Sequence, residues 1–158
     1  MVKFDVIAKD IIEKDKFKSL KQDPHHGLTR YDHVIRVAKN TYRLSRVLKM
    51  DYVSATRGAL LHDYFNDNDY HDIKGIKKGS IHPVIALNNA RREYELNKKE
   101  ENIIVSHMFP LGEVKPNCKE SWLVTTVDKS VALYECTRYK FKDYFAYVFV
   151  LMINFLKF

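Results

Sequence analysis

Apolar residues recur along most of this chain at intervals of three and four positions, which is the period of an amphipathic α-helix. Phe4, Ile7 and Ile11 predict such a helix over residues 3–19. The same spacing predicts six further helices, which cover about residues 30–49, the segment that begins at Asp51, and residues 83–97, 99–108, 120–139 and 141–156. No stretch alternates between apolar and polar residues for long enough to predict a strand. We therefore expect an all-α fold, a bundle of about six to seven helices.

Several predicted helix ends carry residues that are typical of caps and breaks. Thr29 and Asp51 stand where a side chain can accept a hydrogen bond from the first turn of the helix that follows. Pro83 is tolerated in the first turn of a helix, so a helix should begin just after His82. The stretch 66–79 is polar and contains glycine, which predicts a surface loop.

Length and composition indicate one globular domain that spans residues 1–158. The chain has only five glycines and four prolines, too few for a β-sandwich or a disordered linker. Its two cysteines form no CxxC pattern, which excludes a disulfide framework or a thiolate zinc site as the organising element. The formal net charge of +7 favours anionic partners such as phosphates and nucleotides.

The two ends of the chain bear on location and assembly. The first fifteen residues carry four acids and lack the apolar core of a signal peptide, so we expect a cytoplasmic protein. The longest apolar run, residues 144–156, is too short to span a bilayer, and no membrane association is expected. The predicted helix 141–156 is apolar nearly all round, which predicts that it is buried or forms a contact between copies of the chain.

Histidines and aspartates occur where the helical pattern predicts core. His33 lies on the apolar face of its helix, His62 and Asp63 follow the run Gly-Ala-Leu-Leu, and Asp128 lies in another apolar helix. Burying such groups is costly unless they have partners. His25, His26 and His71 lie in polar loops and are interpreted as solvent-exposed or hydrogen-bonded residues.

A divalent cation offsets the cost of burying both imidazoles and carboxylates. With two further histidines at predicted helix ends, the candidate metal ligands are His33, His62, Asp63, His82, His107 and Asp128. This set exceeds what one ion needs, whereas two ions bridged by Asp63 would use all of it. The donor types suit iron, manganese and other first-row metals equally.

The segment Arg30–Val37 (RYDHVIRV), followed by Ala59–Asp63 (ALLHD) and later by Asp128, resembles the HD-domain metal-dependent phosphohydrolases. The resemblance covers about residues 28–135, and among family members it is closest to small stand-alone bacterial HD proteins. His82 and His107 match two additional histidines of the binuclear members. The Gly-Tyr-Pro signature of the cyclic-dinucleotide enzymes is absent, which argues against that substrate.

This resemblance implies an enzyme in which metal-activated water hydrolyses a nucleotide or another small phosphoester or phosphoanhydride. The residues assigned to catalysis are Asp63 at the metals, with Lys129 and Arg36 placed to reach a substrate phosphate. Lys77 and Lys78, in the predicted loop before His82, are further cations that could close over the pocket.

Two other function classes remain open from the sequence. The positive charge is also compatible with a non-catalytic, metal-containing module that binds nucleotide or nucleic acid, although no helix-turn-helix or RNA-binding signature supports nucleic acid. A protein–protein adapter that uses residues 144–156 as its interface is the third class. The complete ligand set favours the enzyme.

Overall fold

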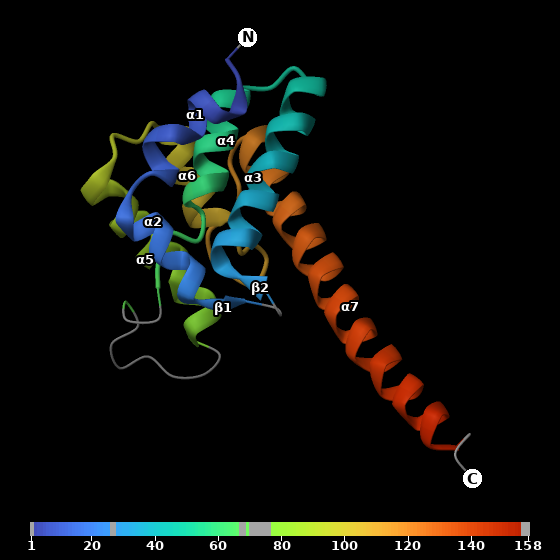
Figure 1. Cartoon of the computed structure of the whole chain (residues 1–158). Helices are drawn as coiled ribbons and strands as arrows, with labels where there is room; N and C mark the ends of the chain where they lie inside the picture. The colour runs from blue at the N-terminus through green and yellow to red at the C-terminus, as the bar shows by residue number, and fades with distance from the viewer. Residues whose placement is uncertain (1, 26–27, 67–68, 70–76, 156–158) are drawn as a thin grey trace.

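The computed structural model describes residues 2–25, 28–66, 69 and 77–155 of the chain. The predicted all-α fold is confirmed, with seven α-helices and one 3-10 turn among these residues (Figure 1). They are α1 (Phe4–Ile12), α2 (Asp15–Ser19), η1 (Leu20–Gln22), α3 (Arg30–Val47), α4 (Tyr52–Leu61), α5 (Lys77–Glu93), α6 (Lys98–Ser106) and α7 (Lys119–Phe155). The extended structure in this part is a pair of two-residue antiparallel strands, β1 (Pro24–His25) and β2 (Leu28–Thr29), immediately before α3.

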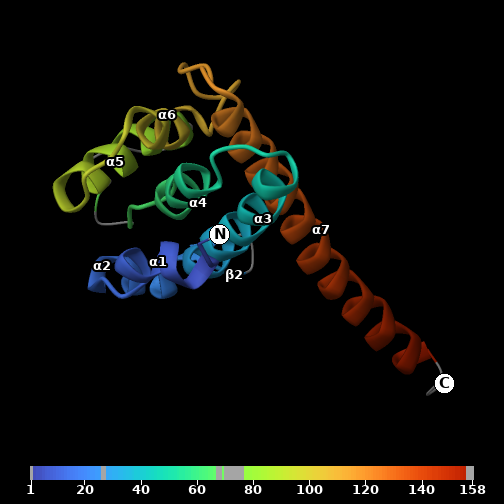
Figure 2. The same ribbon diagram turned by 90° about the horizontal axis from the view of Figure 1, so that it is seen from above.

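Helix α4 is the central element of the bundle. It lies between α1 on one side and α6 on the other and packs along α3 (Figure 2). All of its residues from Ser54 to Leu61 are buried except Arg57. Removing Leu60 and Leu61 completely from water stabilises the fold by about 1.5–3 kcal/mol each. The residues that follow α4 are therefore held in the middle of the molecule.

A glycine sets the distance between α4 and α6. A Cβ atom added at Gly58 would lie 2.7 Å from Cγ2 of Ile103, closer than carbon atoms can approach without a shift. At this point the side chain of Ile103 on α6 lies directly against the backbone of α4. This close approach brings the C-terminal ends of α4 and α6 together.

Both predicted caps are confirmed. The Thr29 hydroxyl accepts a hydrogen bond from the backbone N–H of Asp32 at 3.1 Å, and the Asp51 carboxylate accepts one from Ser54 at 3.1 Å. Each bond satisfies an N–H group that the first turn of a helix leaves without an intrahelical partner. Helix α6 begins with a capping box between Asn97 and Glu100.

Three predicted boundaries are wrong. The helix expected over 3–19 is interrupted between Ile12 and Asp15, where the chain turns from α1 into α2. Helix α5 begins at Lys77, so residues 77–79 are helical rather than part of a loop, and it ends at Glu93 instead of residue 97. Pro83 therefore lies inside the helix, where its missing N–H removes one backbone bond without ending it.

The helices expected over 120–139 and 141–156 are one helix, α7, which is 37 residues long. Its sequence from Lys119 to Phe155 contains no glycine or proline, so nothing in it stops helix propagation. The first half of α7 packs on α3, α4 and α6, and the second half extends away from the other helices (Figure 1). None of the described helices combines the length and hydropathy that crossing a bilayer requires.

Candidate metal centre

The structure brings all six predicted metal ligands together from five segments. His33 comes from the first turn of α3, His82 from α5 and Asp128 from α7. His62 and His107 are the C-caps of α4 and α6, and Asp63 follows His62 directly. The close α4–α6 contact thus delivers two imidazoles and a carboxylate to the same point.

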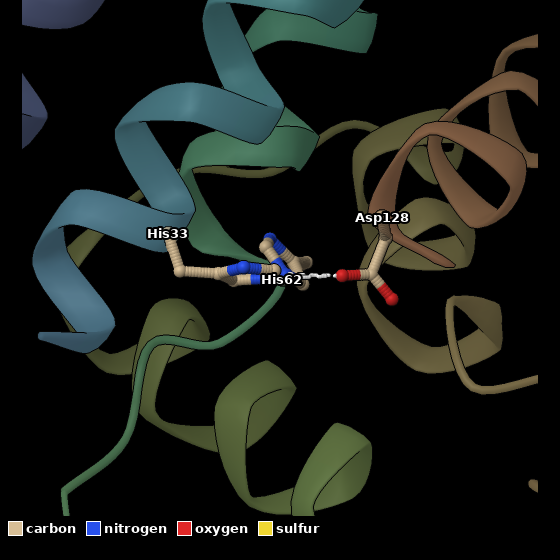
Figure 3. Close-up of side chains that lie close together, drawn as sticks. All are labelled: His33, His62 and Asp128. Atoms are coloured by element: carbon tan, nitrogen blue, oxygen red, sulfur yellow. Dashed lines mark hydrogen bonds and ion pairs between the residues drawn. The ribbon is translucent and has the colours of Figure 1, made fainter. Parts of the chain in front are cut away.

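The α3–α7 subsite consists of His33, His62 and Asp128 (Figure 3). Oδ1 of Asp128 lies 3.0 Å from Nε2 of His33 and 3.5 Å from Nε2 of His62. One donor atom from each residue lies within 4.8 Å of the others, and all three residues are buried. Figure 3 shows both imidazoles directed at the carboxylate.

The α5–α6 subsite consists of Asp63, His82 and His107. Oδ1 of Asp63 lies 3.4 Å from Nε2 of His82 and 3.5 Å from Nε2 of His107. The two Nε2 atoms face each other at 2.9 Å. The subsites adjoin, because the ring centroids of His62 and His107 are 4.9 Å apart.

The donor set fits a divalent cation. Two atoms that each lie about 2.1 Å from one ion are about 3.0 Å apart at right angles and about 3.4 Å apart at the tetrahedral angle. The distances within the α5–α6 subsite match these values. Nε2 of His62 and Oδ1 of Asp63 are buried and have no hydrogen-bond partner, which is costly for polar atoms unless a cation binds there.

Local hydrogen bonds fix which ring nitrogen two of the histidines present. Nδ1 of His62 donates to the carbonyl oxygen of Ala59 at 2.7 Å, and Nδ1 of His107 donates to that of Ile104 at 2.8 Å. A carbonyl can only accept, so both Nδ1 atoms carry a proton. Nε2 of each ring is therefore available to an ion.

His33 is held by Glu135, a residue that the sequence analysis missed. Nδ1 of His33 donates to Oε2 of Glu135 at 2.7 Å, and Nη1 of Arg36 donates to Oε1 of the same carboxylate at 2.6 Å. Glu135 is completely buried. Its position could have been noticed, because it lies seven residues, or two helical turns, after Asp128 on the same face of α7.

Arg30 is a second missed residue at the centre. It is buried, stacks on Phe65 with 3.9 Å between the guanidinium carbon and the ring centroid, and lies 3.8 Å from Oδ2 of Asp63. Arg30 also pairs with Asp23 at 3.5 Å. The contact leaves Oδ1 of Asp63 directed at the two histidines of the α5–α6 subsite. Its spacing of three residues before His33 was the available signal.

Burial disfavours the charged forms of His33, Asp63 and Asp128, but contacts with opposite charges outweigh it. Burial alone would lower the pKa of His33, but hydrogen bonds to Asp128 and Glu135 raise it to about 10. Burial alone would raise the pKa of Asp63 and of Asp128, but the neighbouring imidazole of His62 contributes to holding both pKa values below the usual range. Protons on the imidazoles and a divalent cation can each supply the positive charge that the buried carboxylates require.

The two basic residues assigned to substrate binding, Lys129 and Arg36, form hydrogen bonds with residues of the centre. Nζ of Lys129 donates to the backbone carbonyl oxygen of His107 at 2.8 Å, and burial lowers the pKa of this lysine. Arg36 donates to Glu135, as described above. Contact of either side chain with a substrate stays a prediction.

The remaining histidines and lysines named from the sequence are not placed relative to the centre. The side chains of His25, Lys77 and Lys78, and all of His26 and His71, lie outside the described part of the chain. Lys77 and Lys78 belong to the first turn of α5 and not to a loop.

A family model described as HD domain matches residues 30–133, about two thirds of the chain. The matched segment contains all six candidate ligands and ends two residues before Glu135. Neither a curated protein nor a solved structure matches the chain.

Proposed function

The chain belongs to the HD domain family of metal-dependent phosphohydrolases, and we propose that it hydrolyses a nucleotide or another small phosphoester or phosphoanhydride. The single observation that supports this most strongly is the pair of buried atoms without a hydrogen-bond partner, Nε2 of His62 and Oδ1 of Asp63. The nearest protein groups, Oδ1 of Asp128 for the first atom and Nε2 of His82 and His107 for the second, lie 3.4–3.5 Å away, and a cation bound among them would complete the contacts.

We propose two ions of iron, manganese or another first-row metal, one in each subsite. His33, His62 and Asp128 would hold the first, and His82 and His107 would hold the second. Asp63 would contribute to both, because Oδ1 lies 3.4–3.5 Å from Nε2 of the two histidines of the α5–α6 subsite while Oδ2 lies 3.9 Å from Nε2 of His62. Bound divalent ions lower the pKa of water and neutralise charge on phosphoryl oxygens.

The chain's own contribution is to hold the donors before substrate arrives. Backbone carbonyls fix the rings of His62 and His107, and Arg30 lies beside the outer oxygen of Asp63. Nζ of Lys129 donates to the backbone carbonyl oxygen of His107. A set of donors fixed in this way pays little reorganisation when charge develops on the substrate.

The decisive experiment compares Asp63→Asn with Asp32→Asn. Both substitutions remove one carboxylate charge, but the Asp32 carboxylate accepts from the hydroxyl of Thr29, the N-cap of α3, and takes no part in the centre. We expect the wild-type protein to carry close to two ions by elemental analysis and to hydrolyse members of a nucleotide panel in the presence of Mn²⁺ or Fe²⁺. Asp63→Asn should lose both properties, and Asp32→Asn should keep them.

The other outcomes separate the function classes. Two ions with unaltered nucleotides after prolonged incubation would contradict hydrolysis and favour the non-catalytic nucleotide-binding module. No ion in the wild-type protein, even after loading under reducing conditions, would contradict the metal centre itself.

The predicted contact between copies of the chain through residues 141–156 also stays a proposal. All but the last of these residues belong to the half of α7 that extends away from the bundle (Figure 1). Their side chains lie outside the described part of the chain. Light scattering after size-exclusion chromatography should give twice the chain mass of 18.7 kDa, and the mass of a single chain would contradict the proposal.

A further inference from the structure

A histidine can offer a metal either ring nitrogen, so something must decide which one keeps the proton. His62 and His107 solve this within their own helices. They are C-caps, and the carbonyls of Ala59 and Ile104 that accept from them belong to the last turns of α4 and α6. Carbonyls in a last turn have no intrahelical N–H partner and are free to accept another bond.

His33 has no such carbonyl available. It lies in the first turn of α3, which continues to Val47, so the nearby backbone carbonyls are engaged by the helix. Its Nδ1 instead meets a side chain that is 102 residues away in sequence, Oε2 of Glu135 on α7, at 2.7 Å. The acceptor for His33 therefore has to come from another helix.

Glu135 is held in a position where burial of its charge is costly. Its carboxylate is completely buried, and a buried charge is expensive unless it is paired and hydrogen-bonded. Both oxygens are engaged, one by His33 and the other by Arg36 at 2.6 Å. Arg36 is about one third exposed, so it connects the buried carboxylate to solvent.

We propose that Glu135 is a positioning residue of the metal centre. It keeps the proton of His33 on Nδ1, which directs Nε2 of that ring at the ion, and Arg36 holds the carboxylate in place. The inference rests on the proposed metal-binding function. Carboxylates that accept from the far nitrogen of a ligating histidine orient the ring and increase its basicity, and their loss typically lowers metal affinity about 10–100-fold.

The competing explanation is that Glu135 and Arg36 only tie α3 to α7. A matched control is available, because Glu120 is also a buried carboxylate on α7. It accepts from the backbone N–H of Asp51 at 3.0 Å and pairs with Lys99 at 3.6 Å, and neither partner belongs to the centre. A purely structural role predicts that Glu135→Gln and Glu120→Gln behave alike.

The test is a titration of the full chain with Co²⁺, followed by its d–d absorption, and with Mn²⁺, for wild type, Glu135→Gln and Glu120→Gln. In Glu135→Gln the amide oxygen can serve His33 or Arg36 but not both as the carboxylate does. We expect Glu135→Gln to bind the first ion about 10–100-fold more weakly with an altered Co²⁺ spectrum. Glu120→Gln should match the wild type within about twofold.

Equal affinity and spectrum for Glu135→Gln and wild type would overturn the positioning role, as would equal losses in the two variants. If Glu135→Gln does not fold, the wild type still decides the question. In the Zn²⁺-loaded protein, nitrogen NMR should show His33 with its proton on Nδ1 and slow exchange of that proton with water. A proton on Nε2 would overturn the proposal. Failure of the proposed function is a separate result, because there the wild type itself would bind neither Co²⁺ nor Mn²⁺.

Discussion

The two subsites of the candidate centre differ in how firmly the fold holds them. The α3–α7 subsite draws on three helices that pack directly on one another, and its imidazoles are 0–1% exposed. In the α5–α6 subsite, the side chain of His82 is 12% exposed and comes from α5, which packs mainly on α6. The first subsite is held by three helices that contact one another, whereas the second depends on α5, a helix with fewer contacts to the bundle.

The difference predicts a division of labour. A site fixed by core packing binds its ion tightly because the donors lose little freedom on binding. A site that depends on a less firmly held helix binds more weakly and can adjust to a substrate. We therefore expect the ion of the α5–α6 subsite to enter last and to leave first.

The largest effect should come from removing a ligand of the α3–α7 subsite. Asp128→Asn should lower metal affinity more than about 100-fold, beyond the range for residues that only support a ligand, and should abolish hydrolysis. His82→Gln should remove one ion and leave the other in place. Elemental analysis after stepwise addition of a chelator measures both. Equal losses in the two variants would show that the subsites do not differ.

The sequence predicted the residues of the centre better than their supports. His33, His62 and Asp128 were identifiable because a polar group on an apolar helical face is unusual. Glu135 and Arg30 were not, because charged residues are ordinary in helices and only the three-dimensional structure shows that these two are buried.

The helix boundaries show the limits of local patterns in the same way. Thr29 and Asp51 were predicted as caps because capping is a local interaction between neighbours in sequence. The start of α5 at Lys77 was missed because Pro83 was interpreted as a first-turn residue. The helical pattern predicts two helices over 120–139 and 141–156, although no glycine or proline between Lys119 and Phe155 supplies a break.

The next effect in size concerns the contact that joins the subsites. Gly58→Ala places a Cβ atom 2.7 Å from Cγ2 of Ile103, and overpacking of this kind typically costs about 1–3 kcal/mol. Because α6 ends at His107, a shift of α6 should weaken the α5–α6 subsite more than the other. Thermal unfolding and metal content measure the two consequences. Ile103→Ala, which removes the Cγ2 and Cδ1 atoms that the new Cβ would meet, should restore part of the metal content in the Gly58→Ala background. No restoration would contradict the steric explanation.

A smaller effect is expected at Lys129. Its hydrogen bond is to the carbonyl of His107, a residue of the α5–α6 subsite, so Lys129→Met should lower the affinity for the second ion several-fold and affect the first ion less. Isothermal titration with Mn²⁺ resolves the two steps. Lys119→Met, on the same helix but outside the centre, is the control. A larger change in the binding of the first Mn²⁺ would contradict the assignment of Lys129 to the α5–α6 subsite.

A further effect is a pH dependence of the chelator-treated protein, and it should belong to His33. Its pKa is raised from 6.5 to about 10 in the folded chain, because the hydrogen bonds to Asp128 and Glu135 outweigh its burial. The stability that protonated His33 contributes is therefore fully present below about pH 6.5 and is lost as the pH rises through about 10.

The melting temperature of the chelator-treated wild type should fall between pH 7 and pH 10, by about 2–4 °C for each kcal/mol lost. Other groups also titrate in this range, so the informative quantity is the difference from a variant. His33→Gln removes the titrating ring and should show a smaller decline, whereas His82→Gln should keep the wild-type slope. The same slope in all three proteins would mean that the proton is not held at His33. The two subsites would then differ in packing and not in whether a histidine ligand holds an extra proton.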